Sequence, residues 1–171
     1  MLWNDFLDRV SNLSSEEFLQ QFKHPFLLAT APYSESIVFN IKSAVFNEKT
    51  KLSLSTKASK LADTYVIFLT SNKTRIGREL SCNIIFSDPK ISREHLILSF
   101  LGSGTWILKD CCSRNGTYLN GAKVSGGVPY LLEDGAIIDL GPEVSLIFKT
   151  PIAIWKTIDM FRARLEMSSC G

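Results

Sequence analysis

Three short polar clusters in the second half of the chain carry side chains that can bind an anionic group. They are Arg75-Ile76-Gly77-Arg78, Ile91-Ser92-Arg93-Glu94-His95 and Ser113-Arg114-Asn115-Gly116-Thr117. An arginine guanidinium can hold two oxygens of one anion, a serine hydroxyl can donate to another, and an asparagine amide offers both a donor and an acceptor. These residue types are therefore suited to binding an oxygen-rich, negatively charged group.

The same residues do not form a pattern typical of an enzyme or a metal site. A triad of Ser92, His95 and a distant acid can be drawn on paper, but Ser92 lies outside a G-x-S-x-G elbow and the chain has no G-K-[ST] phosphate loop. The second histidine, His24, is far from His95 in the sequence. We therefore expect no enzymatic activity, no cofactor and no metal ion.

The cysteines do not indicate a zinc site or a disulfide framework. Cys82, Cys111, Cys112 and Cys170 show no C-x-x-C spacing. Free thiols in a reducing compartment are the simplest interpretation, so we expect a cytoplasmic protein.

In order and spacing, the three clusters resemble the forkhead-associated (FHA) domain family, whose pattern is G-R, then S-x-x-H, then N-G. The surroundings match as well: Asp88 and Ile91 precede Ser92, and the runs 113–121 and 132–141 follow the family pattern. The resemblance covers residues 65–148, about half of the chain.

The resemblance implies a twisted β-sandwich whose loops at one end bind phosphothreonine peptides. The residues that would contact the phosphate are Arg78, Ser92, Arg93 and Arg114. The peptide main chain would be clamped by Asn115, and the loops would be held in shape by Gly77, His95 and Gly116. Because Arg114 stands where relatives often carry threonine, the phosphate pocket here departs from the common pattern.

The function that the resemblance implies is that of an adaptor in serine/threonine kinase signalling. Its partners would be phosphothreonine-containing proteins, substrates of such a kinase. One alternative stays open, an FHA fold that acts as a structural subunit and binds its partner without phosphate. The net charge of +2 is nearly balanced, which disfavours a nucleic-acid partner. The sequence has no stretch of 18 apolar residues, so we expect no membrane span. The acidic Asp5 near the N-terminus argues against a secretory signal.

The residue pattern independently predicts an all-β fold between Tyr65 and Phe148. The expected strands are Val66–Thr70, Arg75–Gly77, Ile84–Phe86, Leu96–Phe100, Trp106–Lys109, Thr117–Leu119, Ala136–Leu140 and Val144–Phe148. Turn signals separate them, among them Asn120-Gly121, which favours a type I′ hairpin turn. Many short strands at close spacing are typical of a sandwich.

Helices are expected at both ends of the chain. Apolar residues recur at helical spacing from Trp3, and Ser14 with Glu17 forms a capping box that begins a second helix before Pro25. A C-terminal amphipathic helix follows Pro151, with its basic residues in solvent.

These patterns divide the chain into three parts. Residues 1–60 are expected to form an extension of two helices and short strands packed on the sandwich, 61–150 an FHA/SMAD-like β-sandwich, and 151–171 a C-terminal helix and tail. The short strands of the extension are expected around Phe26–Ala29, Ile37–Ile41 and Leu52–Ser55, with a linker at 57–60. The oligomeric state is not predicted.

Overall fold

The computed structural model describes residues 1–30, 39–41, 64–142 and 144–168. The helices are α1 (Trp3–Val10), α2 (Ser15–Gln21) and α3 (Pro151–Ser168). The strands are β1 (Phe26–Thr30), β2 (Phe39–Ile41), β3 (Thr64–Phe68), β4 (Lys73–Gly77), β5 (Ile84–Phe86), β6 (Leu96–Gly102), β7 (Thr105–Asp110), β8 (Thr117–Leu119), β9 (Ala122–Lys123), β10 (Pro129–Leu132), β11 (Ile137–Leu140) and β12 (Val144–Lys149).

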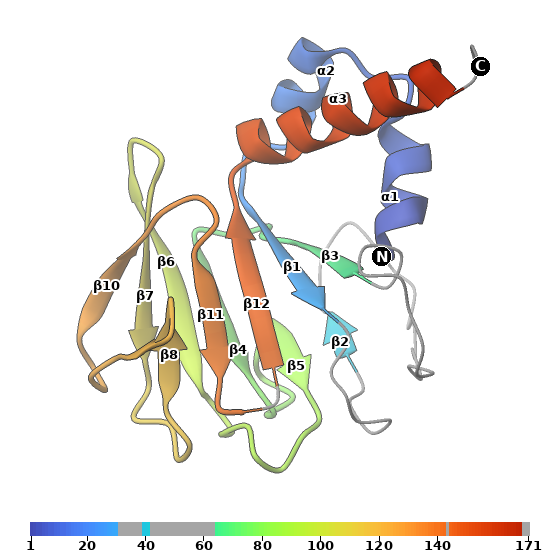
Figure 1. The fold of residues 1–171 in the computed structure, drawn as a ribbon. Helices are drawn as coiled ribbons and strands as arrows, with labels where there is room; N and C mark the ends of the chain where they lie inside the picture. Colours follow the sequence, from blue (N-terminus) through green and yellow to red (C-terminus); the bar gives the residue numbers. More distant parts are fainter. Residues whose placement is uncertain (31–38, 42–63, 143, 169–171) are drawn as a thin grey trace.

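The described strands form two sheets that face each other, with the helices gathered at one end (Figure 1). One sheet has the order β3-β1-β12-β11-β8-β9 and the other the order β10-β7-β6-β4-β5-β2. The pairs between neighbouring strands are antiparallel except for β4 and β5, which are parallel. This arrangement confirms the predicted all-β sandwich with helices at its N- and C-terminal ends.

Alternating burial places the core between the two sheets. In β12 the buried residues Val144, Leu146 and Phe148 alternate with partly exposed ones, as a strand with one face in a core requires. The same main core contains Trp106 of β7 and Leu98 of β6 from the opposite sheet.

Strand β1 belongs to the sandwich, although the sequence analysis placed it in the extension before residue 60. It lies between β3 and β12, with Leu27 and Ala29 in the main core. Its other face, with Phe26 and Leu28, is buried in a second core under the helices. Because both faces are covered, β1 is a continuous apolar run rather than an alternating one. One sheet of the sandwich therefore includes Phe26–Thr30, which lies within the range 1–60 that the sequence analysis assigned to the extension.

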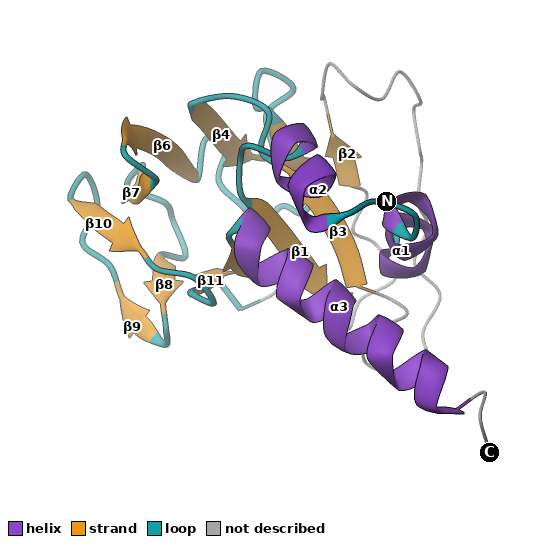
Figure 2. Ribbon diagram, turned by 90° about the horizontal axis from the view of Figure 1, so that it is seen from above, coloured by secondary structure: helices purple, strands orange, loops and turns teal. Residues whose placement is uncertain are grey.

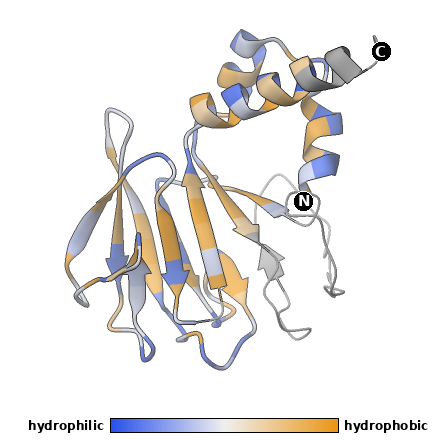
Figure 3. Cartoon of the chain, in the orientation of Figure 1, coloured by the Kyte–Doolittle hydropathy of each residue, from blue (hydrophilic) through white to orange (hydrophobic). Residues whose placement is uncertain are grey.

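The second core lies between the three helices and the outer face of the β3-β1-β12 part of the sheet (Figure 2). Its fully buried aromatic residues include Trp3, Phe6 and Phe18. Phe6 contacts Phe22, Phe26 and Phe68 with ring centroids 5.7–5.9 Å apart. In Figure 3 the strands beneath α3 are mostly orange, whereas α3 carries both orange and blue segments, as a helix with one apolar face does. The terminal helices thus bury their apolar faces against the sheet and against each other.

Arg162 of α3 fastens the C-terminal helix to the end of α1. Its guanidinium donates to the carbonyl oxygens of Val10 (2.5 Å) and Leu13 (3.2 Å) and lies 4.8 Å from the ring centroid of Trp155. The last carbonyls of a helix have no partner within the helix, and a cation is favoured there. The expectation that the basic residues of this helix lie in solvent is therefore wrong for Arg162.

The predicted start of the second helix is confirmed. Ser14 accepts a hydrogen bond from the backbone of Glu17, and the Glu17 carboxylate accepts one from the backbone of Ser14 (2.8 Å). The hydrogen bonds that the Glu17 carboxylate accepts from the Ser14 N–H and from the Ser14 hydroxyl lower the pKa of this carboxyl, since they favour its charged form.

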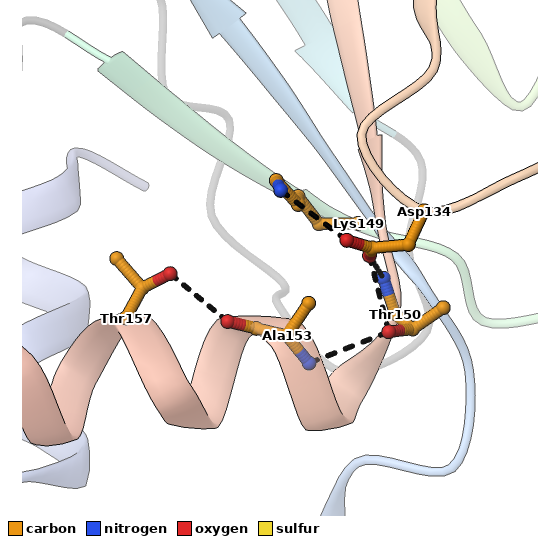
Figure 4. A network of polar contacts seen from close by, with 5 residues as sticks. All are labelled: Asp134, Lys149, Thr150, Ala153 and Thr157. Carbon is orange, nitrogen blue, oxygen red and sulfur yellow. Dashed lines mark hydrogen bonds and ion pairs between the residues drawn. The ribbon is translucent and has the colours of Figure 1, made fainter.

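Asp134 joins the β10–β11 turn to the start of α3 (Figure 4). Its carboxylate accepts from the backbone N–H of Thr150 (2.7 Å) and from the Lys149 ammonium (3.3 Å). The Thr150 hydroxyl in turn accepts from the N–H of Ala153, which caps the helix. Pro151 is then the first helical residue, where its missing N–H costs nothing.

The strands expected between Tyr65 and Phe148 are present; two of them match exactly, and the end points of the others differ by at most two residues. The hairpin at Asn120-Gly121 is confirmed, since both residues have positive φ (52° and 81°) and β8 and β9 pair on either side. Strands β9 and β10 were not predicted, because one is two residues long and the other begins at Pro129 on a sheet edge. The strand expected at 52–55, the linker at 57–60 and Ile37 lie outside the described residues.

We expect Phe6→Ala to lower the free energy of unfolding by about 3–5 kcal/mol, because a fully buried ring leaves a cavity. Urea unfolding followed by circular dichroism measures this. Leu19→Ala is the matched control: Leu19 lies on α2 and is 38% exposed, so its loss should cost less than about 1 kcal/mol. Equal effects of the two changes would contradict a second core beneath the helices.

Candidate functional site

Three loops meet at the end of the sandwich opposite α3 (Figure 1). They are the β4–β5 loop (residues 78–83), the β5–β6 connection (87–95) and the β7–β8 loop (111–116). The register places them together, since Ile76 near the end of β4 pairs with Leu96 at the start of β6, which pairs with Asp110 at the end of β7. The three sequence clusters that could bind an anion therefore lie at one end of the fold.

The β4–β5 loop is fixed against the β5–β6 connection by backbone contacts. The N–H of Arg78 donates to the carbonyl of Ser92, and that of Glu79 to the carbonyl of Arg93 (both 3.0 Å). A Cβ at Gly77 would overlap the carbonyl oxygen of Arg93, so this close approach requires glycine. The Arg78 backbone is thus held in place while its side chain is exposed.

The other end of the β4–β5 loop is closed by Asn83. Its side-chain carbonyl accepts from the N–H of Arg75, and its own N–H donates to the carbonyl of Arg75 (both 2.9 Å). The loop that carries Arg78 is therefore fastened at both ends.

His95 connects the β5–β6 connection to the β7–β8 loop. Its ring is fully buried, Nδ1 accepts from the backbone N–H of Ser92 (3.2 Å), and Nε2 lies 3.2 Å from the carbonyl oxygen of Gly116. Both contacts are satisfied at once by the neutral ring with its proton on Nε2. Burial lowers the pKa of His95, and the Gly116 carbonyl and the Asp110 carboxylate oppose this only in part.

The carbonyl of Gly116 is a second junction between loops. Besides the His95 ring, it accepts from the N–H of Gly141 (3.0 Å), at the turn between β11 and β12. Gly116 itself has φ of +78°, a conformation that glycine adopts without strain.

Asp110 organises the β7–β8 loop from inside the protein, and the sequence analysis did not identify it. The residue is 3% exposed, and its carboxylate accepts from the hydroxyls of Ser113 and Thr117 (both 2.6 Å) and from the N–H of Ser113 (3.0 Å). Burial acts to raise the pKa of this carboxyl, but the hydrogen bonds outweigh it and the pKa lies below its usual value. The sequence signal was weak, an aspartate with serine three residues later.

Ser92 and Arg114 meet across the gap between two loops. The backbone N–H of Arg114 donates to the Ser92 hydroxyl oxygen (2.9 Å). Nearby, the Asn115 side-chain NH₂ donates to the carbonyl of Lys90 (2.7 Å). Each of these side chains keeps hydrogen-bonding capacity for a ligand: the Ser92 hydroxyl hydrogen, and the carbonyl oxygen and second amide hydrogen of Asn115.

An open pocket of about 370 Å³ lies between these loops. Its lining includes Arg78, Ser92, Arg93 and Arg114, the residues expected to contact phosphate. Asn115 is not part of the lining. It follows Arg114 directly, and its side chain donates to the carbonyl of Lys90, which is a lining residue. Gly77, His95 and Gly116 are not part of the lining and are the residues whose contacts, described above, hold the loops.

The thiols of the described residues are not paired with each other. Cys82 is buried and Cys111 is half-buried, and burial with the nearby Glu94 carboxylate raises the pKa of Cys111 to about 11. Cys112 is exposed. Within the described part of the chain, no group of His, Cys, Asp and Glu is arranged to hold a metal ion, and no helix is long and apolar enough to cross a membrane.

We expect the free energy of unfolding to fall as the pH is lowered from 7.5 to 5.5. The pKa of His95 is depressed in the folded protein, so the unfolded chain binds its proton first, near pH 6.5, and the stabilisation present above that pH is lost below it. Urea unfolding at both pH values measures how steeply the free energy of unfolding changes with pH. His95→Gln, which cannot titrate, should flatten this dependence, and an unchanged slope in this variant would contradict the assignment.

Comparisons with known proteins agree with the motif pattern. Residues 74–141 match the FHA domain family model. The chain is 40% identical over 62 residues to the E3 ubiquitin-protein ligase DMA1 of Saccharomyces cerevisiae and 36% identical over 74 residues to an FHA domain-containing protein of Arabidopsis thaliana. These alignments cover 34% and 43% of this chain but only 15% and 19% of the two relatives.

A solved relative is the N-terminal FHA domain of Rad53p from Saccharomyces cerevisiae, whose structure contains a phosphothreonine peptide. It is 24% identical, with a TM-score of 0.47, and the alignment covers 50% of this chain and 83% of that one. The motifs, the two sheets and the family match over residues 74–141 lead to one conclusion: this chain contains a forkhead-associated domain.

Proposed function

We propose that the pocket between the three loops binds a phosphothreonine of a partner protein, and that the chain is a phosphorylation-dependent adaptor rather than an enzyme. FHA domains are binding modules, and relatives of this domain bind phosphothreonine peptides. The observation that carries the proposal is the pairing of Ser92 with Arg114 beside Arg78. It leaves a hydroxyl donor and cationic side chains around one open pocket.

The role proposed for Ser92 follows from its hydrogen bond. Its oxygen already accepts from the Arg114 N–H, so the hydroxyl is held in place and its own hydrogen can donate to a phosphate oxygen. A donor fixed before the ligand arrives loses little rotational freedom on binding.

The role proposed for Arg78 rests on the contrast between its backbone and its side chain. The backbone N–H is bonded to Ser92, whereas the guanidinium is exposed at the pocket. A guanidinium can donate two parallel hydrogen bonds to a phosphate, a geometry that lysine cannot reproduce.

Asn115 is proposed to bind the peptide main chain beside the phosphate. One amide hydrogen is used on the carbonyl of Lys90, which fixes the plane of the side chain. The remaining donor and acceptor match the carbonyl and N–H of an extended peptide. The partners would then be substrates of a serine/threonine kinase, and a kinase would control the interaction.

Arg78→Ala should weaken binding of a phosphothreonine peptide by about 2–5 kcal/mol, because it removes the partner of a dianion. Calorimetric titration measures the loss. Arg75→Ala is the matched control, since Arg75 is an exposed arginine of β4 that does not line the pocket. We expect this control to bind as the unaltered protein does. Undiminished binding by Arg78→Ala would refute the proposed site.

Phosphothreonine should be preferred over phosphoserine by more than about fourfold. Burying one methyl group contributes about 0.8 kcal/mol, and the branched threonine side chain loses less rotational freedom when its phosphate is fixed. Titrations of one peptide with phosphothreonine, phosphoserine or unmodified threonine test this selectivity. They also test the alternative function, a structural subunit that binds its partner without phosphate. Equal affinity for the two phosphopeptides would rule out a methyl contact. Tight binding of the unmodified peptide would favour a partner recognised without phosphate.

A further inference from the structure

Strands β4, β6, β7 and β10 present an outer face that is more apolar than a solvated sheet face usually is. Along each strand the outward residues alternate with core residues, and in an antiparallel sheet such outward positions are typically polar. Here they include five apolar residues: Ile97, Leu101, Ile107, Pro129 and Leu131. Leu101 and Leu131 are 63% and 66% exposed, so this outer sheet face is open to solvent.

The register of the strands joins these apolar residues into one patch. Leu131 of β10 is the cross-strand partner of Ile107 of β7. Ile97 of β6 and Pro129 of β10 lie on either side of Lys109, which places Ile97 diagonally across from the same Ile107. Cross-strand partners lie about 5 Å apart and diagonal neighbours about 7–8 Å apart, within reach of long side chains. The helices leave this patch open, because the strand residues of the second core come from β1, β3 and β12.

The charged side chains of the outer sheet face are all cationic. They are Lys73 and Arg75 of β4 and Lys109 of β7, and all three are exposed. The one carboxylate in these four strands belongs to Asp110, which is buried and hydrogen-bonded to Ser113 and Thr117. Within the described part of the chain, none of the three cations forms an ion pair. The apolar patch therefore has a positively charged border.

A second copy of the chain does not fit this face. In a two-fold dimer the same cations would be brought together from both copies, and like charges across an interface reduce affinity. With strands about 4.8 Å apart and a rise of about 3.3 Å per residue, the face has a footprint of about 400 Å². Each partner in a stable complex buries about 800 Å². The face is therefore suited to a partner of opposite charge that is bound with moderate affinity.

We infer that the outer face of β4, β6, β7 and β10 is a second binding surface, separate from the pocket, and that it binds a protein partner whose own apolar patch is bordered by carboxylates. Burial of the apolar residues supplies affinity, and the opposite charges supply orientation and faster association. Binding at this face requires no phosphate, so it does not depend on the proposed function. Because β4 and β7 lead from this face into the loops of the pocket, one partner can contact both surfaces.

The test uses the full chain, labelled with nitrogen-15, and a synthetic helical peptide that has leucines along one face, glutamates beside them and no phosphate. Titration followed by NMR should shift the amide signals of the four strands, those of Ile107 and Leu131 among them. The signals of Ser92 and Asn115 at the pocket should stay in place. A version of the peptide with glutamine for glutamate should bind at least about fivefold more weakly, the combined effect of three solvated charge pairs. High salt should reduce this difference, since it screens the charges.

Charge reversal attributes the binding to particular residues. Lys73→Glu combined with Lys109→Glu should abolish binding of the glutamate peptide and create binding of a version with lysine in place of glutamate. This exchange of specificity also shows that the variant is folded. Lys123→Glu combined with Lys156→Glu is the matched control, since it makes the same change of charge at exposed positions of β9 and α3. The control should still bind the glutamate peptide. Leu131→Ser should weaken binding of the glutamate and the glutamine peptides alike, because both bury this side chain.

Several results would overturn the inference. Signals of the four strands that do not shift with any peptide would refute it, and equal losses in the two double variants would assign the effect to net charge. Binding to vesicles of phosphatidylcholine and phosphatidylserine, without binding to the peptide, would assign the face to a lipid surface. A dimer in sedimentation that Leu131→Ser dissociates would assign it to a second copy. Lys73 and Lys109 do not line the pocket, so their double variant should bind a phosphothreonine peptide as the unaltered protein does. A parallel loss would contradict two separate surfaces.

Discussion

The buried imidazole of His95 is the contact on which the shape of the binding end depends. A neutral ring has one acceptor and one donor, and the two loops supply one N–H and one carbonyl at its opposite edges. The first belongs to Ser92 and the second to Gly116, so a single side chain sets the separation of the loops that border the pocket. Burial away from water keeps the ring neutral and thereby preserves the match.

Around this contact, the loop-fixing residues His95 and Asp110 are buried, whereas the arginines that line the pocket are exposed. Asp110 is enclosed and fully hydrogen-bonded, whereas the guanidiniums of Arg78 and Arg114 are in solvent. This division has a physical reason, since a cation buried without an anion costs far more than one left hydrated. The arginines at this end of the sandwich therefore stay hydrated, and under the proposed function they would lose that hydration only when the phosphate binds.

Local sequence motifs identified the groups that line the pocket but not all of the groups that hold the loops in place. Arg78, Ser92 and Arg114 were identified by local motifs, and the structure brings them to one pocket. Asp110 had no comparable signal, because its partners become apparent only when the loop closes. The same limit applies to long-range packing: nothing local shows that Arg162 caps α1, about 150 residues earlier in the chain.

The position of β1 links the two ends of the molecule. Its inner face packs in the main core and its outer face under the helices, so both hydrophobic cores share one strand. Removing the helices would expose Phe26 and the outer face of β3 and β12 to water. This exposure would destabilise the sheet, which also contains β8 and β11. Those strands begin and end at the Gly116 and Gly141 junction beside the pocket. The helices therefore support the binding end through the stability of the shared sheet, although they lie at the opposite end of it (Figure 1).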